Sequence, residues 1–307
     1  MKKIIIIKSS GGELANQLWN YASILAYTKE TGAELQNWSF FEYARYFKNL
    51  KHPWFVEHIF FNRFRNDITR KSALKKRVWR KIYDIFSRIV IYFNQKSLIQ
   101  VKDHEEVFVL PPTSNKHLDE LSKSDTIYLD GWIFRNSDGI AKHRDYISSY
   151  FAPQDSIASE VENFISPLRA KYKHVIGVHI RQGDYKTWRG GAYYISPKEM
   201  SDIVKLYLEK ANLDTKDTCL VIASDGNVPL DLFAYTNAVP TNMSMVYDLF
   251  ALSKCDVVIG SDSTFGDFAC YLGNIPHIIA KKEPVDWEYY QGKNYFFENK
   301  YCSWVHY

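Results

Sequence analysis

The chain alternates short runs of aliphatic and β-branched residues with longer stretches in which apolar positions recur at helical spacing. Four such runs in its second half are predicted as strands, at 174–180, 218–223, 255–260 and 275–280. The helix after the first of them begins with a capping box, in which Glu199 stands three residues after Ser196 and Pro197 takes the first helical position. Strands and helices that alternate at these lengths predict a parallel, doubly wound α/β sheet.

The first half opens in the same way. A β-branched run over residues 4–7 leads through a glycine-containing loop to a helical apolar pattern that ends at Gly32, where a C-terminal cap belongs. Strand, glycine loop and helix in this order begin a βαβ unit. Because 307 residues suit two domains, we place them at 1–160 and 161–307 and expect a ligand to bind between them.

The net charge of +4 conceals one strongly basic stretch. Residues 62–96 hold eleven Lys or Arg against two Asp, a local charge of +9, so the rest of the chain carries −5. Such a local excess argues against a nucleic-acid-binding protein and for a single basic surface. The stretch is predicted as a helix with its cations mostly off one apolar stripe. That stripe consists of Leu74, Val78, Ile82, Ile85, Phe86, Ile89 and Phe93.

Two interpretations of this basic helix stay open. It is either packed against its own domain with a solvated basic face, or attracted to an anionic lipid surface. No apolar run reaches the roughly 18 residues that a membrane-spanning helix needs, and the basic start precedes only four apolar residues, too few for a signal peptide. The four cysteines lack metal-ligand spacing, and three of them lie in or beside apolar runs, where buried free thiols are usual. We therefore expect a cytoplasmic protein, peripheral on the inner face of the membrane if the basic helix binds lipid.

Polar residues follow directly on the predicted strands of the second half. The strand at 174–180 carries His179 one residue before its end and is followed by Arg181 and Asp184. The strand at 255–260 leads to Ser263 and Thr264 at the start of a helix. Carboxyl ends of parallel strands share one edge of the sheet, where ligands bind, and a helix start with hydroxyls is a cradle for phosphate. These groups are predicted to converge on one diphosphate. A surface salt bridge and an ordinary helix cap are the alternatives.

A carboxylate that could recognise guanine lies near the same edge. Asp248 stands early in the helix before the strand at 255–260 and could accept both the N1–H and the N2–H₂ of guanine, which adenine cannot satisfy. A solvated helix-face residue is the alternative, and Asp225, after the strand at 218–223, is the next candidate. The chain has no P-loop, no Asp-x-Asp and no dinucleotide spacing of glycines, so we expect neither NAD nor a metal at this site.

Three segments together resemble the α-1,2-fucosyltransferase-like family, glycosyltransferase family 11, and its wider group of α-1,2-, α-1,6- and protein O-fucosyltransferases. Gly12-Glu-Leu-Ala-Asn-Gln17 is close to the family's Gly-Gly-Leu-Gly-Asn-Gln, and His179-Ile-Arg-Gln-Gly-Asp-Tyr185 is close to His-Val-Arg-Arg-Gly-Asp-Tyr. The segment from Asp248 to Phe265 follows the family's closing motif nearly throughout. In order and spacing the three segments span most of the chain.

The resemblance implies a GT-B fold of two Rossmann-like domains facing a central cleft, an acceptor-side N-terminal domain and a donor-binding C-terminal one. It implies an inverting enzyme of the galactoside 2-α-L-fucosyltransferase type, which takes GDP-fucose as donor and an oligosaccharide or lipid-linked glycan as acceptor and needs no metal or other cofactor. By position it assigns Arg181 to the β-phosphate, His179 and Asp248 to the guanosine, Ser263 and Thr264 to the diphosphate, and Asn16 to the reacting fucose. We also expect Asp225 and Phe265 in the donor site.

The sequence departs from the family pattern at two places. Gln182 replaces a second arginine, which weakens neutralisation of the diphosphate, and Glu13 and Ala15 replace glycines in a loop that has to approach the donor closely. Candidates for the base that accepts the proton of the acceptor hydroxyl are Asp184 and Glu13, while a path with late proton loss needs no strong base. A GT-B enzyme using another GDP-sugar, such as GDP-rhamnose or GDP-mannose, and a non-catalytic nucleotide-binding protein are the rival interpretations.

Overall fold

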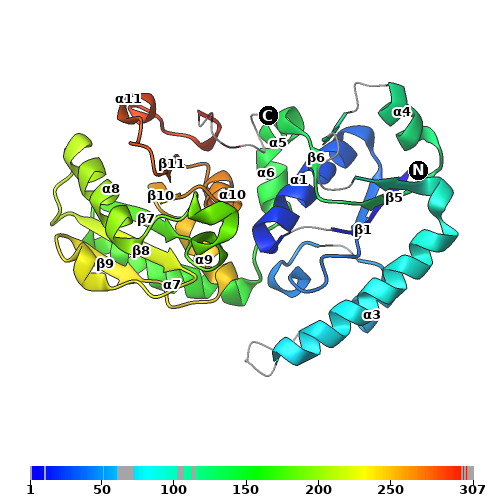
Figure 1. The fold of residues 1–307 in the computed structure, drawn as a ribbon, viewed down its shortest axis with the longest axis horizontal. Helices are drawn as coiled ribbons and strands as arrows, with labels where there is room; N and C mark the ends of the chain where they lie inside the picture. The colour runs from blue at the N-terminus through cyan, green and yellow to red at the C-terminus, as the bar shows by residue number, and fades with distance from the viewer. Residues whose placement is uncertain are drawn as a thin grey trace. The chain divides into compact units, whose positions relative to one another are not determined.

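The computed structural model describes residues 2–9, 12–50, 52–60, 72–101, 107–111, 115–298, 300 and 302. The chain divides between Gln154 and Asp155 into two compact units, each built of strands and helices (Figure 1). Every strand pair of both units is parallel. The predicted α/β class with parallel sheets is therefore confirmed. Among the helices in the described part of the chain, none combines the length and the apolar character that crossing a bilayer requires.

The first unit contains a four-stranded sheet in the order β2-β1-β5-β3 and a separate pair formed by β4 and β6. Its strands are β1 (Lys3–Lys8), β2 (Glu34–Asn37), β3 (Leu98–Gln100), β4 (Phe108–Val109), β5 (Thr126–Asp130) and β6 (Phe134–Arg135). Its helices are α1 (Leu14–Thr31), α2 (Trp54–Ile59), α3 (Ser72–Phe93), α4 (Asn115–Ser122), α5 (Ser137–Lys142) and α6 (Arg144–Tyr150). The predicted end of α1 is confirmed, because Gly32 adopts the left-handed conformation that a C-terminal cap needs, with a φ of 70°.

The core of the first unit forms around β1 and α1. The four isoleucines of β1 are buried, since this strand lies between β2 and β5 in the middle of the sheet. Helix α1 packs against β2, β6, α5 and α6. Its largest buried side chains are Trp19 and Tyr21, and the Tyr21 ring meets those of Phe40 and Phe151 edge to face.

Helix α3 packs against the first unit through a face other than the aliphatic stripe that its sequence displays. The side chains that pack against the unit are Trp79, Tyr83 and Phe86, all of which contact the ring of Phe60. The Tyr83 hydroxyl also donates to the carbonyl oxygen of Ile7, at 2.6 Å. The predicted stripe faces outward, with the sole exception of Phe86 among its described side chains. Its exposed members are Val78, Ile82, Ile85, Ile89 and Phe93.

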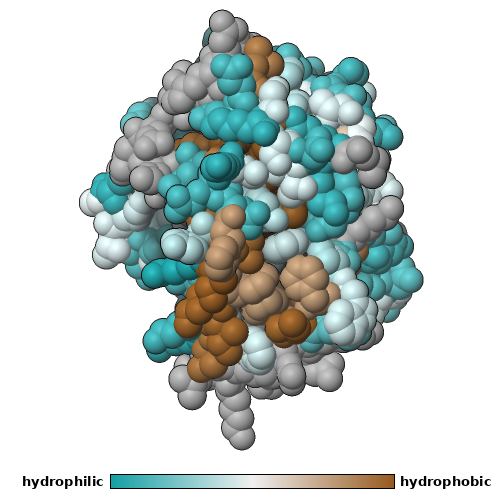
Figure 2. Space-filling view, turned by 90° about the vertical axis from the view of Figure 1, so that its right-hand side faces the viewer, coloured by the Kyte–Doolittle hydropathy of each residue, from teal (hydrophilic) through white to brown (hydrophobic). Residues whose placement is uncertain are grey.

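The size of the aromatic side chains explains which face of α3 packs against the unit. Two apolar stripes run along α3 about 100° apart, and the stripe of larger, aromatic residues fills the space over the sheet. Helix α3 therefore packs against its own unit, as one of its two sequence interpretations has it, and the aliphatic stripe lies outside that contact. Figure 2 shows that stripe as an elongated hydrophobic band on the surface. Residues 62–71 of the predicted basic helix, and the side chains of 72–76, lie outside the described residues.

The second unit is a five-stranded sheet in the order β11-β10-β7-β8-β9. Its strands are β7 (His174–Ile180), β8 (Thr218–Ser224), β9 (Asn237–Pro240), β10 (Val257–Ser261) and β11 (His277–Ala280). Its helices are α7 (Asp155–Lys171), α8 (Pro197–Lys210), α9 (Met245–Leu252), α10 (Thr264–Gly273) and α11 (Trp287–Tyr290). Side chains of β7 alternate between the two faces, so that Ile176, Val178 and Ile180 join α8 in one core while Gly177 faces α9. The predicted strands are confirmed with ends shifted by up to two residues.

Short single turns of 3₁₀ helix complete the secondary structure at Ala44–Tyr46, Gln95–Ser97, Asp184–Lys186, Trp188–Gly191, Leu230–Phe233 and Phe296–Glu298. All four cysteines are free and buried, which confirms the prediction for the three that lie in or beside apolar runs and extends it to the fourth.

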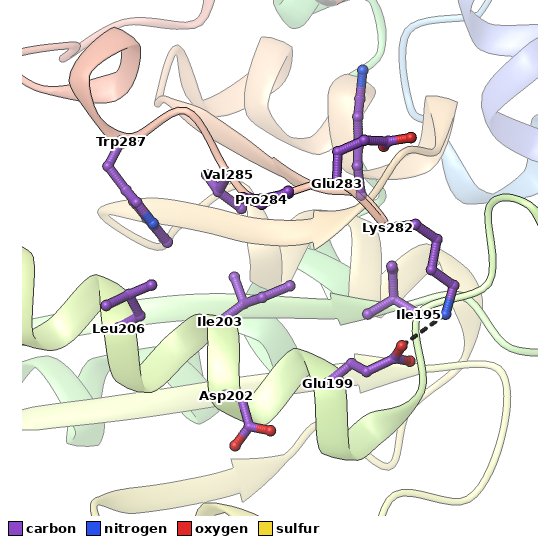
Figure 3. Close-up of a pocket in the computed structure, with 11 residues that line it drawn as sticks. Ile195, Glu199, Asp202, Ile203, Leu206, Lys282, Glu283, Pro284, Val285 and Trp287 are labelled. Carbon is purple, nitrogen blue, oxygen red and sulfur yellow. Dashed lines mark hydrogen bonds and ion pairs between the residues drawn. The ribbon is translucent and has the colours of Figure 1, made fainter.

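The predicted capping box of α8 is confirmed and is tied to a second segment. Ser196 accepts from the N–H of Glu199, whose carboxylate accepts from the N–H of Ser196 at 2.7 Å and from Nζ of Lys282 at 2.8 Å. Glu199 and Lys282 border a cavity of about 470 Å³ between α8 and the segment after β11, with Trp287 on its far side (Figure 3). Burial raises the pKa of Glu199, but the bonds from Lys282 and Ser196 outweigh it and lower that pKa to about 2.

We expect Glu199→Ala to lower the free energy of unfolding by about 1–2 kcal/mol, the usual effect of losing a capping interaction. Because the folded-state pKa lies below the unfolded value, the contribution is present above about pH 4.3 and is lost as the pH falls toward 2. Urea titrations at pH 7 and pH 3 measure it, with Glu209→Ala at an exposed position of the same helix as the control. Equal losses in the two variants at pH 7 would contradict the assigned role.

Candidate active site

Three strand ends in the middle of the second sheet carry the polar residues that the sequence singles out. Strands β10, β7 and β8 are adjacent and parallel, so Ser261, Ile180 and Ser224 end at the same edge. Arg181 follows β7, Asp225 follows β8, and Ser263 caps α10 after β10. The structure thus brings the predicted diphosphate-binding groups to one edge, because a parallel sheet places all its carboxyl ends there.

Arg181 is held between two carboxylates. Its Nε and Nη2 lie 3.0 and 2.8 Å from Oδ1 of Asp184, and its Nη1 lies 2.8 Å from Oδ2 of Asp225. Its backbone N–H donates to the hydroxyl of Ser261 on β10, at 3.0 Å. The guanidinium has five N–H donors, so two remain for an anion after these three contacts. The arginine is therefore fixed in orientation and is still able to bind a phosphate.

Asp225 shapes the loop that carries this arginine. Its Oδ1 accepts from the backbone N–H groups of Gln182 and Gly183, at 2.6 and 3.3 Å. A β-carbon on Gly183 would lie 2.7 Å from Oδ2 of Asp225, so only glycine permits this approach. Both oxygens of Asp225 are occupied, one by the loop and one by Arg181. Asp225 therefore positions the arginine.

Gln182, which carries no charge for a diphosphate, connects two loops. Its side chain is buried, and its Nε2 donates to the hydroxyl of Ser224 and to the carbonyl oxygen of Asn227, at 3.1 and 2.9 Å. A β-carbon on Gly226 would lie 2.8 Å from the Gln182 side chain. The glutamine therefore holds the loop after β7 against the loop after β8.

The start of α10 forms the second part of the edge. Ser263 caps the helix by accepting from the N–H of Phe265, at 3.3 Å, and Thr264 is the first helical residue. The first turn of a helix presents N–H groups and the positive end of its dipole, which favour an anion. The hydroxyl of Tyr185 donates to the carbonyl oxygen of Asp262 at 2.9 Å and so connects the loop after β7 to this helix start.

His179 lies beneath this edge in an apolar setting. Its ring is buried and lies 5.0 Å from that of Phe265, and its Nδ1 has no hydrogen-bond partner among the described residues. Burial, with the nearby His277 and Arg181, lowers the pKa of His179 to about 3. The imidazole is therefore neutral at pH 7. Its predicted contact with guanosine stays a prediction.

Asp248 borders a cavity of about 360 Å³ at the ends of β8 and β9. The cavity is lined by Ile222, Ser224, Gly226, Asn227, Val228, Leu230, Pro240, Thr241, Asn242, Met243 and Asp248. The carboxylate is nearly buried, and its Oδ1 has no partner within the part of the chain that the structure describes. Burial raises the pKa of Asp248 to about 6, although a hydrogen bond with Thr241 opposes the shift. A buried, unsatisfied acceptor beside a cavity indicates a ligand that donates hydrogen bonds to it.

The remaining predicted residues, Glu13 and Asn16, lie in the first unit at the start of α1. Gly12 has a φ of +73° and is packed so tightly under Asn16 that a β-carbon would overlap its side chain. This glycine preserves the loop although Glu13 replaces its neighbour. Glu13 is the N-cap residue, and its Oε2 accepts from the hydroxyl of Tyr43 at 2.6 Å. Burial and the charge of Glu13 raise the pKa of Tyr43, which keeps the phenol protonated as a donor.

Two groups that position the candidate site could not be found from the sequence. These are Ser261, which fixes the backbone of Arg181, and the cavity lining from Thr241 to Met243. A turn-forming run after β9 was the only signal for the lining, and nothing in the sequence indicated that it faces Asp248. The described residues include no group of three or more His, Cys, Asp or Glu side chains arranged to hold a metal ion.

Comparison with known proteins finds similarity of structure and not of sequence. No protein-family profile matches the chain, and no curated protein sequence matches it. A mutant of Arabidopsis thaliana FUT1 in complex with GDP superposes with a TM-score of 0.52 at 12% identity, over 92% of this chain and 71% of that one. POFUT1 in complex with GDP gives 0.49 at 14% identity, over 92% and 96% of the two chains. The fucosyltransferase NodZ from Bradyrhizobium gives 0.49 at 14% identity, over 90% and 94%.

At these identities the likeness establishes the fold alone. It rests on the similarity to Arabidopsis thaliana FUT1 and on the two parallel α/β units of the chain itself. The chain has a GT-B-type fold with Rossmann-like domains, as the family resemblance of its sequence implies.

Proposed function

We propose that the protein is a glycosyltransferase that moves fucose from GDP-fucose to a glycan hydroxyl, with inversion at the anomeric carbon and formation of an α-1,2 linkage. The observation that carries the proposal is the cavity beside Asp248, whose unsatisfied carboxylate shares a sheet edge with Arg181. The carboxylate of Asp248 can accept hydrogen bonds from guanine, and the guanidinium of Arg181 can donate hydrogen bonds to phosphate. The two side chains thus match the two parts of GDP. The structural likeness to a GDP complex of Arabidopsis thaliana FUT1 supports it.

Asp248 is a better candidate for reading guanine than Asp225. Guanine presents two donors, N1–H and N2–H₂, to an acceptor, whereas adenine presents an acceptor at N1. Oδ1 of Asp248 has no partner in the described chain, while both oxygens of Asp225 are bonded to the loop after β7 and to Arg181. The paired acceptor and the enclosing cavity explain selection of GDP over ADP.

Arg181 and the start of α10 stabilise the leaving group. Cleavage of the bond between fucose and phosphate places a negative charge on GDP, and groups fixed in advance around that charge stabilise the transition state more than the ground state. Two free donors of Arg181 and the first turn of α10, with Ser263 and Thr264, lie at the edge where this charge develops. These residues perform the neutralisation for which other glycosyltransferases use a metal ion.

The acceptor proton has two candidate destinations. Asp184 uses Oδ1 to hold Arg181, which leaves Oδ2 to receive a proton, and Glu13 is held by Tyr43 at the start of α1. Late proton loss from an oxocarbenium-like transition state demands little of either base. The roles of Asn16 near the fucose and of His179 and Phe265 near the guanosine complete the proposed donor site.

The proposal is tested by ligand-induced thermal stabilisation followed by donor turnover. GDP should stabilise the protein, whereas UDP and ADP at the same concentration should not. Donor hydrolysis with GDP-fucose, GDP-mannose and GDP-rhamnose then separates the fucosyltransferase from an enzyme for another GDP-sugar. GDP binding without turnover of any donor would identify a non-catalytic nucleotide-binding protein. An acceptor-glycan array with labelled GDP-fucose, followed by linkage analysis of the product, tests the acceptor and the α-1,2 bond.

We expect turnover to persist in excess EDTA. The proposed phosphate ligands are a guanidinium, two hydroxyls and helix N–H groups, all of which are donors, whereas Mg²⁺ and Mn²⁺ require oxygen acceptors. The measurement is the initial rate of GDP release with EDTA and after adding back Mn²⁺. A rate that vanishes in EDTA and returns with Mn²⁺ would contradict the proposed site.

A further inference from the structure

Helix α3 exposes an apolar stripe that its own unit does not cover. Six side chains, 40–77% exposed, follow one another at helical spacing over about four turns: Val78, Ile82, Ile85, Ile89, Tyr92 and Phe93. Soluble proteins seldom leave a continuous apolar band of this kind in water. The stripe appears in Figure 2 as a band with hydrophilic residues beside it. It indicates a surface that is covered by a partner.

Cations flank the stripe on one side. Arg77, Lys81 and Arg88 are exposed and lie roughly 60–100° around the helix from the centre of the stripe, on the side away from the packed aromatic residues. Arg88 pairs with Asp84 on the same helix, at 2.9 Å. Neither Arg77 nor Lys81 forms an ion pair with a residue in the described part of the chain. These cations lie where they can reach a charged layer beside the apolar contact.

We propose that α3 lies in the headgroup region of an anionic lipid bilayer, with its apolar stripe toward the acyl chains and its cations on lipid phosphates. An exposed apolar face bordered by Lys and Arg is the pattern of interfacial helices. The aromatic pair Tyr92 and Phe93, with rings 5.3 Å apart, ends the stripe, and aromatic rings favour the membrane interface. The charge of +9 over residues 62–96 complements an anionic surface.

A second copy of this chain is a poorer occupant of the stripe. Two stripes meeting face to face would bring two segments of charge +9 together, and like charges at a contact oppose association. The inference does not depend on the proposed glycosyl transfer, because it rests on the exposed side chains of α3 and on the charge of residues 62–96. Its test therefore uses binding and not activity.

The test is co-sedimentation of the full chain with vesicles of phosphatidylcholine containing about one third phosphatidylglycerol, at low and high salt. Binding should be strong at about 0.1 M salt and much weaker at about 1 M, where the Debye length falls from about 10 Å to about 3 Å. Arg77→Gln with Lys81→Gln should lower the partition coefficient by about fivefold per cation. Ile85→Asn with Ile89→Asn should lower it by about tenfold per residue. All four side chains are exposed, so the fold should persist.

Matched controls lie on other helices and surfaces. Lys210→Gln with Lys216→Gln removes two exposed cations from the second unit, and Leu118→Asn removes an exposed apolar side chain from α4. These variants should bind vesicles as the parent does. A third variant, Ile85→Trp, places a fluorophore in the stripe, and its emission should shift to the blue on addition of anionic vesicles.

Three results of the vesicle experiments would overturn the inference. They are absence of binding to anionic vesicles at low salt, unchanged binding by the Ile85→Asn and Ile89→Asn variant, and unchanged emission of the Ile85→Trp variant when vesicles bind. A parent dimer in gel filtration that the asparagine variant disperses would assign the stripe to a second copy of the chain, and so would also overturn it.

Discussion

Replacing Arg181 with alanine should lower kcat for transfer from GDP-fucose by about 10²–10³, with a smaller change in the affinity for GDP-fucose. This is the scale on which removal of one fixed charge-stabilising donor acts. The effect falls on kcat because the charge on the phosphate develops in the transition state. Arg181→Lys should recover little, since an ammonium cannot bridge Asp184 and Asp225 and also contact the phosphate as the planar guanidinium does.

The measurement is the initial rate of GDP release at saturating donor, together with circular dichroism to verify the fold. Arg144→Ala is a suitable control, because this arginine pairs with Asp145 at the surface of the first unit. Near-normal turnover by the folded Arg181→Ala protein would remove the arginine from the mechanism and would leave the start of α10 as the only assigned anion site.

Asp248→Asn should weaken GDP binding by about 10–100-fold and erase most of the preference for GDP over ADP. A charge-assisted hydrogen bond contributes about 1.5–3 kcal/mol, and an amide cannot accept two protons from guanine without presenting its own NH₂ group to one of them. Calorimetric titration with GDP and ADP measures both changes. Asp202→Asn, at an exposed carboxylate that pairs with Lys198, is the control. If Asp248→Asn still rejects ADP as the parent does, another group reads the base.

The same carboxylate predicts a pH dependence. Guanine requires the ionised form, so GDP affinity should fall about tenfold per pH unit below the pKa of about 6 and should lose this dependence in Asp248→Asn. The stability of the unliganded protein should depend on pH in the opposite direction. The folded-state pKa lies above the unfolded value of about 3.9, so stability decreases as the pH rises from about 4 to 6 and the carboxylate ionises in its buried setting. Asp248→Asn should therefore raise the Tm of the unliganded protein at pH 7, whereas a lowered Tm would assign Asp248 a structural role.

Local patterns were sufficient to predict most of the second unit. The capping box at Ser196 and Glu199 and the apolar run of β7 each report on contacts within a few residues, which the sequence displays directly. The parallel sheet followed from the lengths of the alternating elements, and it placed Arg181 and Ser263 at one edge without knowledge of any side-chain contact. Short β3 and β4, with three and two residues, escaped prediction because so few positions show no period.

The sequence could not show the contacts between residues that are far apart along the chain. The sequence shows that Gln182 carries no charge for a diphosphate, but it does not show that the amide bonds to Ser224 and Asn227, because the loops after β7 and β8 become neighbours only when the sheet forms. Tertiary contacts also decide that both oxygens of Asp225 are bonded. They likewise leave Oδ1 of Asp248 without a partner among the described residues.

The sequence by itself determined the parallel α/β fold, the strand ends that carry the site and the amphipathic character of α3, since each follows from periodicity and local capping. Only the tertiary structure decided which stripe of α3 is buried. Periodicity shows where apolar side chains lie around a helix, but burial depends on the shape of the surface that the helix meets. Here the rings of Trp79 and Tyr83 fit against Phe60, and the aliphatic stripe that the sequence displays is left on the surface.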